Sequence, residues 1–506
     1  MRTHQPVNNH EDLLGVVDGL LEEIGLDRRD TGERVTFSGL DPLRPTVLKT
    51  GAASAAIAAT NAIASAILWR HRGGEGQDIH VDLRKAFSYQ SPWQDVLVDC
   101  TKLNGQSIMS LGNYGGEFLL PTRDNRFVVV IAPYPSQQVK VGRIFRCGFI
   151  EEQMAQVARK WDAADLEAAG QDISLPISMV RTVEEFQASD HWRDHASTPL
   201  IHIEKIGESE PEPLPPSARP LSGVRALGLT HVVAGPTTLR QLAAQGADCL
   251  NLNMPRYVED PNVYVQSDAG VRQAILDART TRVPGTPATN RKAVYDLVRD
   301  ADVFVENLKP QQAAREGYAA EDLAAVRPGV VYLRLKLNTV TGPWANWVGF
   351  DLNAGAFTGV YTAEGSPEQP RFPVGVNVVV DFLCGILATA GVQAALLRRA
   401  VEGGSYRVTV TLAQTTSFEL SLGLNDKAKL LTLDELGAEH QIQTPNLITG
   451  MTPFGELTRL GSQVEMSKTP EYWSDPILVP PGSSRPEWLP RETRTQRSAT
   501  AVRRAA

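Results

Sequence analysis

Two long apolar stretches limit the folds open to this chain more than any other feature of its sequence. They span residues 52–69 and 378–397, and both are rich in Ala, Gly, Ser and Thr. Each is about as long as a membrane span, but the first contains Asn61 and the second contains Asp381. Polar and charged groups are costly in a bilayer, whereas small residues allow helices to pack closely inside a protein. We therefore predict two buried core helices and no membrane span.

The two stretches belong to a repeated unit. The segments "LWRHRGGEGQDIHVDLRKAF" (68–87) and "LLRRAVEGGSYRVTVTLAQTTSF" (396–418) both run from an apolar helix through arginines and a Gly-Gly break into an alternating strand. The Gly pairs start at 73 and 403, which are 330 positions apart, so Gly51 takes the place of Asp381 in the first copy. The pattern indicates a second, altered copy of one helix-turn-strand unit. The open alternative is that any buried helix followed by a Gly turn and a strand would look similar.

A Pro-rich, acidic stretch at 207–223 predicts an extended linker between two modules. Before it, we predict a strand at 126–132 and helices at 150–161 and 179–195, which is typical of a mixed α/β module.

After the linker, strands and helices alternate. We predict strands at 224–230, at "CLNLN" (249–253), at "VFVENL" (303–308) and at "PGVVYLRLKL" (328–337), with helices between them. Such alternation predicts an α/β fold with a Rossmann-like parallel sheet, whose ligand lies over the carboxyl ends of the strands.

Composition excludes several classes of function. A formal net charge of −8 over 506 residues provides no basic field for nucleic acid, although the last residues, 491–506, are locally basic and predict a disordered tail. The four cysteines, spaced widely and without a CxxC pair, favour reduced structural thiols in a cytoplasmic protein over a disulfide framework or a metal site. The polar N-terminus has no apolar signal core, which also favours a cytoplasmic location.

Four sequence blocks resemble the class III CoA-transferase family, the CaiB/BaiF group of formyl-CoA transferases, carnitine CoA-transferases and 2-methylacyl-CoA racemases. The blocks are "LSGVRALGLTHVVAGPTTLRQLAAQGAD", "DADVFVENLKP", "TGPWANWVGFDLNAGAFTG" and "PVGVNVVVDFLCGILATAGVQAALLRR". Residues 221 to about 418 resemble the first half of a family member, and 47 to about 205 resemble the second half, including "LGNYGGEFLLPTRDNRFVVV" from its smaller domain. The order is therefore permuted and partly duplicated.

The resemblance implies a Rossmann-like sheet domain plus a smaller α/β domain. With the linker, it divides the chain into an N-terminal helical segment (1–46), a second-half module with a central helix that lacks the nucleophile (47–205), the linker (206–221), a first-half module with the catalytic helix (222–418), a C-terminal arm (419–490) and the basic tail (491–506).

For Asp381, the resemblance implies the role of nucleophile, because it stands at the family's catalytic aspartate in "VVVDF". In the family this carboxylate attacks an acyl-CoA thioester, and a mixed anhydride and then an aspartyl-CoA thioester follow. That chemistry requires a poorly hydrated carboxylate with backbone N–H groups nearby. Asp351, in "GFDLNAG", matches a family acid that tunes the nucleophile. The open alternative for both residues is a helix cap.

The resemblance also implies CoA contacts in two loops. His231, Val232, Val233 and Ala234 match the loop that runs along CoA in the family, and Asn307, Leu308 and Lys309 match the segment near its diphosphate. The open alternative is that these loops only close βα turns.

Departures from the family pattern separate the possible activities. The racemase histidine is replaced by Phe350, and no histidine occurs between His231 and His440, so racemisation is disfavoured. A frequent basic position holds Met254, and the Gly-rich loop reads "KLNT" at 336–339, which weakens the case for CoA phosphate binding. Val233 stands where formyl-CoA transferases often have Gln.

We therefore predict an acyl-CoA:carboxylate CoA-transferase, with acyl-CoA and a carboxylic acid acceptor as partners and without a metal. A catalytically impaired CoA-binding homologue and an isomerase or racemase-like enzyme remain as alternatives. Family members are interlocked dimers, so a homodimer and an internal pseudo-dimer are both open.

Overall fold

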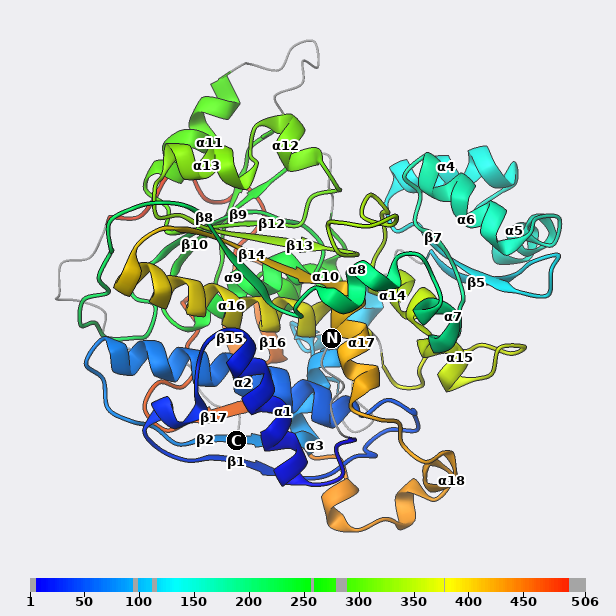
Figure 1. Cartoon of the computed structure of the whole chain (residues 1–506), viewed down its shortest axis with the longest axis horizontal. Helices are drawn as coiled ribbons and strands as arrows, with labels where there is room; N and C mark the ends of the chain where they lie inside the picture. Colours follow the sequence, from blue (N-terminus) through cyan, green and yellow to red (C-terminus); the bar gives the residue numbers. More distant parts are fainter. Residues whose placement is uncertain are drawn as a thin grey trace.

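A seven-stranded sheet organises the second half of the chain (Figure 1). The computed structural model describes residues 6–93, 99–111, 116–255, 259–278, 289–376 and 378–490. All neighbouring strands are parallel except the last pair, β14 and β8. In order across the sheet they are β11 (Arg272–Ile275), β10 (Asp248–Asn253), β9 (Arg225–Leu229), β12 (Val303–Glu306), β13 (Val331–Lys336), β14 (Ser405–Thr411) and β8 (His202–Gly207). This confirms the predicted mixed α/β fold with a largely parallel sheet.

Helices cover both faces of this sheet, as its apolar strands require. Helices α11 (Thr289–Arg299) and α13 (Ala320–Val326) lie over one face, and α9 (Ala234–Ala244) and α16 (Asp381–Glu402) lie over the other (Figure 1). Helix α2 (Thr50–His71) packs along α16 on the side away from the sheet.

The two predicted core helices, α2 and α16, are both long and apolar enough to span a membrane by length and composition, yet both are buried inside the molecule. A polar network at their contact uses the Asn61 that interrupts the first apolar stretch. Gln393 Nε2 of α16 donates to Asn61 Oδ1 (2.7 Å), and Ser65 Oγ donates to Gln393 Oε1 (2.7 Å). Buried polar groups that are paired in this way fix the register of the two helices.

Each core helix leads into a strand of similar surroundings. After α2, strand β2 (Ile79–Asp82) pairs in parallel with β1 (Val35–Ser38) and antiparallel with β17 (Val464–Met466). After α16, β14 likewise pairs in parallel with β13 and antiparallel with β8. At both turns the chain passes through a glycine with positive φ, Gly73 (84°) and Gly403 (67°), a conformation that disfavours other residues. The two copies of the unit therefore lie on opposite sides of the α2–α16 contact.

The smaller domain is an antiparallel sheet covered by helices. Its strands are β5 (Glu117–Pro121), β6 (Phe127–Ile131) and β7 (Ile177–Met179), and its helices are α4 (Pro135–Phe145), α5 (Glu151–Ala158) and α6 (Ala163–Asp172).

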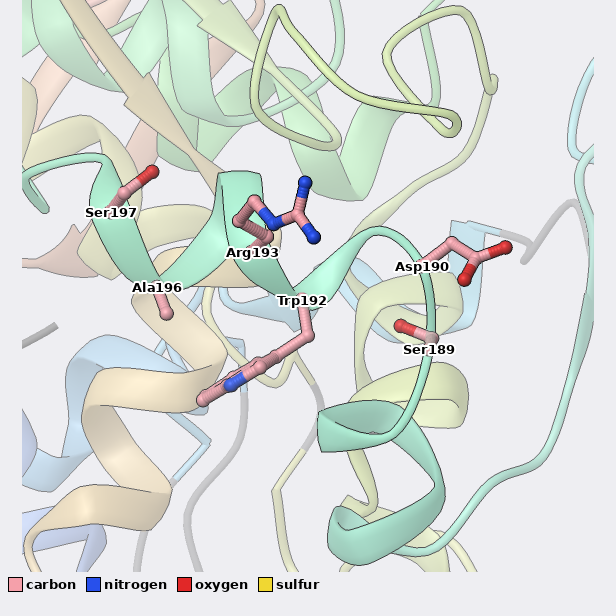
Figure 2. Close-up of a pocket in the computed structure, with 6 residues that line it drawn as sticks. All are labelled: Ser189, Asp190, Trp192, Arg193, Ala196 and Ser197. Carbon is pink, nitrogen blue, oxygen red and sulfur yellow. The ribbon is translucent and has the colours of Figure 1, made fainter.

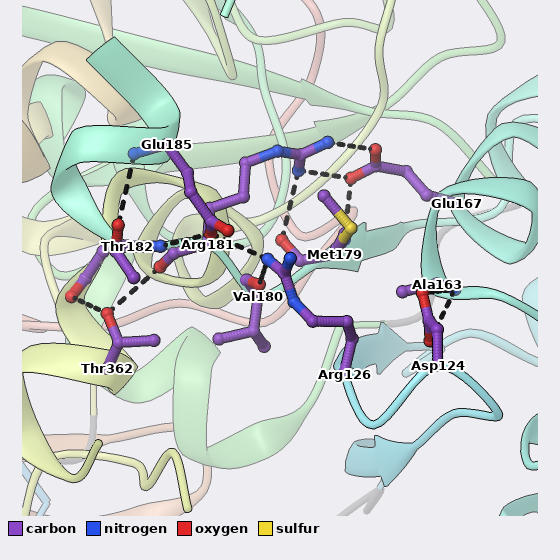
Figure 3. Close-up of polar contacts among 11 residues, drawn as sticks. Asp124, Arg126, Ala163, Glu167, Met179, Val180, Arg181, Thr182, Glu185 and Thr362 are labelled. Atoms are coloured by element: carbon purple, nitrogen blue, oxygen red, sulfur yellow. Dashed lines mark hydrogen bonds and ion pairs between the residues drawn. The ribbon is translucent and has the colours of Figure 1, made fainter. Parts of the chain in front are cut away.

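Arg181 connects this domain to the rest of the molecule, and a buried ion pair fixes its side chain (Figure 3). The Arg181 guanidinium donates to both carboxylate oxygens of Glu167, at 2.8 and 2.6 Å, and lies over the ring of Trp344. The Arg181 backbone N–H donates to Ala356 O of α14 (Asp351–Thr358), and Thr362 Oγ1 of α15 (Val360–Glu364) donates to the Arg181 carbonyl. One residue thus joins the small domain to the two helices that follow Asp351.

Two segments differ from the sequence-based predictions. The first is the predicted helix at 179–195, which is two short helices, α7 (Val183–Gln187) and α8 (Trp192–Ser197), separated by the turn-forming Ser189 and Asp190. The predicted linker contains no helix or strand from 208 to 223, and the Arg72 guanidinium donates to the carbonyls of Pro215, Pro220 and Ser222 within it.

The segment expected to be an extended arm contributes strands. Strands β15 (Leu447–Thr452) and β16 (Gly455–Leu460) form a four-stranded sheet with β3 (Lys102–Leu103) and β4 (Gln106–Ser107), and β17 joins β2. The tail, 491–506, lies outside the described residues. The remaining helical elements are α1 (His10–Glu23), η1 (Arg28–Thr31), α3 (Leu83–Ala86), η2 (Phe87–Gln90), η3 (Ile108–Leu111), α10 (Pro261–Ser267), α12 (Gln312–Glu316), α17 (Leu412–Ser421), α18 (Lys427–Leu430), η4 (Leu433–Glu435) and η5 (Ala438–His440).

Candidate active site

Asp381 and Asp351 both stand at the first residue of a helix. Asp381 begins α16 and is 7% exposed, and Asp351 begins α14 and is 5% exposed. A helix N-terminus carries partial positive charge, which favours an anion at this position. The structure therefore brings the two predicted catalytic carboxyl groups to one buried region.

Asp351 receives backbone hydrogen bonds. Its Oδ2 accepts from the N–H groups of Val379 (2.8 Å) and Val380 (3.3 Å), immediately before Asp381, and its Oδ1 accepts from Leu352 N–H (2.8 Å). Asp351 thus caps the start of α16 from another element. The capping alternative that the sequence left open therefore applies to Asp351, which also lies next to Asp381.

The two carboxyl groups interact electrostatically. Burial raises the pKa of Asp381 well above its usual value, and the charge of Asp351 raises it further. Burial also raises the pKa of Asp351, but the backbone N–H groups oppose this by stabilising its ionised form. Two buried carboxyl groups so close together retain a proton more readily than either would alone.

The loop before α9 lies against the start of α16. A Cβ built at Gly385 would lie 2.5 Å from Ala234 O, so only glycine permits this close approach. Thr238 Oγ1 donates to Gly385 O at 3.1 Å, across the same contact. Asn307, after β12, holds the loop, because its Oδ1 accepts from His231 N–H (3.1 Å) and its Nδ2 donates to His231 O (2.6 Å). The structure therefore joins the two predicted CoA-contact segments at the carboxyl ends of adjacent strands.

Three other residues of these segments are buried or make backbone hydrogen bonds. Val233 and Leu308 are buried in apolar clusters. Leu308 N–H donates to Glu306 Oε2 at 2.7 Å, and Lys309 O accepts from Gln312 N–H at 3.0 Å.

One basic side chain near these segments is already paired within the protein. Lys336 pairs with Glu306 at 2.8 Å and donates to Leu308 O at 2.8 Å, so its charge is neutralised within the sheet domain. Met254 is buried in the apolar cluster on one side of the sheet. Arg256 and Arg279, further basic residues of interest, lie outside the described residues.

Additional acids surround the pair, and the sequence did not single them out. Burial and the charge of Asp351 raise the pKa of Glu117, the first residue of β5. Burial raises the pKa of Glu419 to about 8; this side chain accepts from Gln90 Nε2, which also donates to Val379 O. Glu117 lay within a family-like block, but no local pattern reveals that it meets Asp351 across two domains.

Position 51, which corresponds to Asp381 in the predicted repeat, has close neighbours on its side-chain side. Gly51 N–H and Ala52 N–H donate to Asp41, at 3.2 and 2.7 Å, and a Cβ at Gly51 would lie 2.5 Å from Leu43 Cδ1. Burial raises the pKa of Asp41 to about 6. Position 51 therefore lies at the start of a helix that is already capped by a carboxylate, and a side chain there would have to displace Leu43.

An open depression of about 790 Å³ lies along α8, and Asp381 is not among the residues that line it. Its lining residues are Ser189, Asp190, Trp192, Arg193, Ala196 and Ser197 (Figure 2). In the described parts of the chain, no three His, Cys, Asp or Glu side chains come together as a metal site. The four cysteines are free thiols.

Comparison with known proteins places these residues in context. Residues 221–424 match the family described as CoA-transferase family III. Acetyl-coenzyme A transferase nodX of Hypoxylon pulicicidum is 28% identical over 280 residues, covering 52% of this chain and 46% of the relative. Succinate–glutarate CoA-transferase of Agrobacterium fabrum is 28% identical over 226 residues, covering 41% of this chain and 54% of the relative. The chain thus spans about half the length of these curated relatives.

A solved structure was also matched. A CAIB/BAIF family protein from Brucella suis aligns with a TM-score of 0.36 and 22% identity, covering 47% of this chain and 65% of that protein.

Proposed function

The chain carries a CoA-transferase family III segment at residues 221–424, and on that premise we propose that it transfers CoA from an acyl-CoA to a carboxylic acid through the side chain of Asp381. The observation that carries the proposal is the isolated, buried carboxyl group of Asp381 at the start of α16, beside a second carboxyl group that is already capped. Burial keeps this carboxyl group poorly hydrated, and therefore nucleophilic once it is ionised, and the charge of Asp351 raises its pKa.

Each step balances without a metal. The proton shared by the pair moves to Asp351, and the Asp381 carboxylate attacks the thioester carbon, so that the C–S bond breaks and CoA leaves as a thiolate. The thiolate then attacks the Asp381 carbonyl carbon of the mixed anhydride, which releases the donor acid and leaves an aspartyl-CoA thioester. An acceptor carboxylate attacks this thioester, and the thiolate finally attacks the acceptor carbonyl, which frees Asp381.

Asp351 has two effects in this scheme. Its charge keeps Asp381 protonated and unreactive until substrate arrives, and its hydrogen bonds from Val379 and Val380 fix the chain just before the nucleophile. His231, Val232, Val233 and Ala234 would lie along CoA, with Asn307, Leu308 and Lys309 nearer its diphosphate.

A second candidate is a CoA-binding homologue that no longer turns over. The buried Met254 and the Lys336–Glu306 pair favour it, because neither position offers a free cation to a phosphate. A racemase-like activity has no such support, since Phe350 replaces the base that it needs.

The two modules are proposed to act as an internal pseudo-dimer with one reacting site per chain. The packing of α2 on α16 and the closed place at Gly51 support this arrangement over two equal sites. The four free cysteines support a reducing compartment such as the cytoplasm.

Intact-protein mass spectrometry tests the proposal. The wild type and Asp381→Asn are incubated with a panel of short acyl-CoAs, and hydroxylamine is added to trap the anhydride or thioester. An adduct that maps to Asp381 and disappears in the variant supports transfer. CoA binding without any adduct, for every donor, would favour the non-catalytic homologue.

A further inference from the structure

The turn before α9 contains a strained residue. Val232 has a φ of 63°, in the left-handed region, where a β-branched side chain is a true outlier. Strain of this kind persists only when the surrounding structure holds the residue in place. The contacts of Val232 therefore identify what maintains the turn.

Glu259 binds Val232 itself, while Asn307 holds the preceding His231. Glu259 Oε2 accepts from Val232 N–H at 3.2 Å, and the Tyr134 hydroxyl donates to the same carboxylate, at 3.0 Å to Oε2 and 3.2 Å to Oε1. Tyr134 caps α4 in the small domain, and Glu259 precedes α10 of the sheet domain. The ring of Tyr134 also meets His231 edge to face, with centroids 6.4 Å apart. One carboxylate thus ties together the strained turn and both domains.

The turn is close to the proposed nucleophile. Two residues after Val232, the Ala234 carbonyl fits against Gly385 in the first turns of α16. Any movement of the turn would displace α9 relative to the helix that carries Asp381.

We propose that Glu259 and Tyr134 form a latch that holds the strained Val232 turn against the Asp381 end of α16, so that Glu259 is a positioning residue for the reaction. The inference rests on the proposed CoA transfer for its consequence in catalysis, but the latch itself is a structural claim.

The charge state of Glu259 makes the latch sensitive to pH. Burial raises the pKa of Glu259 to about 7, against the hydrogen bonds from Tyr134 and Val232, and Asp260 adds to the increase. The groups that face it are Tyr134 from α4, His231 from the turn, and Asp260 and Asp268 at the two ends of α10. Because the buried Glu259 retains a proton that a solvated carboxyl group would release, the turn should become less firmly held as the pH rises through about 7.

Amide hydrogen exchange tests the latch independently of activity. Exchange of a peptide covering 229–239 is measured at pH 6 and pH 8, corrected for intrinsic rates, in the wild type, Glu259→Gln, Tyr134→Phe and the control Glu152→Gln, an exposed residue of α5. We expect about 10-fold faster exchange in Glu259→Gln, since losing a charged hydrogen bond has an effect of this size. Tyr134→Phe should change in the same direction. Protection should decrease from pH 6 to pH 8 in the wild type, the control and Tyr134→Phe, which all retain Glu259, but not in Glu259→Gln. Wild-type exchange in both latch variants would overturn the latch.

Kinetics then test its role. With adduct formation at Asp381 as the assay, Glu259→Gln should raise the acyl-CoA concentration for half-maximal rate about 10-fold and flatten its dependence on pH near 7, because the variant cannot ionise. If exchange changes but these kinetics do not, the turn is latched yet does not position substrate, and the proposed role is wrong. Absence of an adduct in the wild type would contradict the proposed transfer and leave the exchange result to stand alone.

Discussion

Gly385 offers the sharpest test of how the CoA-contact loop is placed against the nucleophile. In Gly385→Ala the new Cβ would lie 2.5 Å from Ala234 O and 2.8 Å from Thr237 Cβ. Carbon atoms pack best at about 3.5–4.0 Å, so α9 and α16 must separate by roughly 0.5–1 Å. The backbone carbonyl of Ala234 cannot rotate aside as a flexible side chain could.

The cost can be estimated from this overlap. Overpacking costs about 1–3 kcal/mol, and the better helix propensity of Ala returns about 1 kcal/mol, so we expect a net loss of up to about 2 kcal/mol in the free energy of unfolding. Misplacing reacting groups by about 1 Å can slow a reaction about 100-fold. We therefore expect the rate of adduct formation at Asp381 to fall far more than the stability does.

Two matched variants complete the design. Gly391→Ala lies on the same helix, but its Cβ would meet only side chains, Ile201 Cγ2 at 2.6 Å and Val408 Cγ1 at 2.8 Å, on the sheet side. Gly142→Ala, in α4, has no atom within 4 Å and should be neutral or slightly stabilising. Urea unfolding gives the stabilities, and single-turnover mass spectrometry gives the rates. If Gly391→Ala slows the reaction as much as Gly385→Ala, or if Gly385→Ala reacts at the wild-type rate, the reasoning is refuted.

Three further predictions follow from buried groups. Glu167→Ala leaves the Arg181 guanidinium buried without its partner and should cost about 3–5 kcal/mol in urea unfolding; a loss below about 1 kcal/mol would contradict this. Burial raises the pKa of Glu419 to about 8, so the native state retains a proton that the unfolded state releases, and wild-type stability should fall by roughly 4 kcal/mol between about pH 4.5 and 8. In Glu419→Gln, melting temperatures measured across this pH range should no longer fall with pH. If the melting temperatures of the wild type and the variant fell in parallel, the reasoning would be wrong. Gly51→Asp should be destabilised, because its Cβ would meet Leu43, and should form no second adduct, so two adducts per chain would disprove the closed first copy.

Local pattern was enough to predict much of the fold. Five of the seven strands of the large sheet, β9, β10, β12, β13 and β14, were predicted from periodicity, with α9 between β9 and β10, because each buries a regular apolar face within a few residues. The edge strands β8 and β11 were not predicted. The placement of Asp381 and Asp351 came from family-like blocks. Their burial and the backbone N–H groups that reach Asp351 were visible only in the structure.

Pairings between distant segments could not be predicted in this way. Strand β17 has three residues and joins β2 across most of the chain, so it carries no periodic signal of its own. Glu259 and Tyr134 meet from different domains, and each is an ordinary polar residue in its own local sequence. Side chains acquire such roles through tertiary contacts, which local sequence propensity does not encode.

The starts of the two core helices can be compared residue by residue. At both, an aspartate from a preceding segment accepts backbone N–H groups. Asp41 binds the N–H groups of Gly51 and Ala52, which by the 330-residue spacing correspond to positions 381 and 382. Asp351 binds the N–H groups of 379 and 380, and the N–H of Asp381 also favours its ionised form. Both capping aspartates therefore act on position 381 or on its counterpart, position 51. The two helix starts differ in the residue at that position, which is glycine in the first and, in the second, an aspartate whose pKa is raised by the neighbouring charge of Asp351. The proposed reacting site is thus distinguished by the identity of the residue at that position.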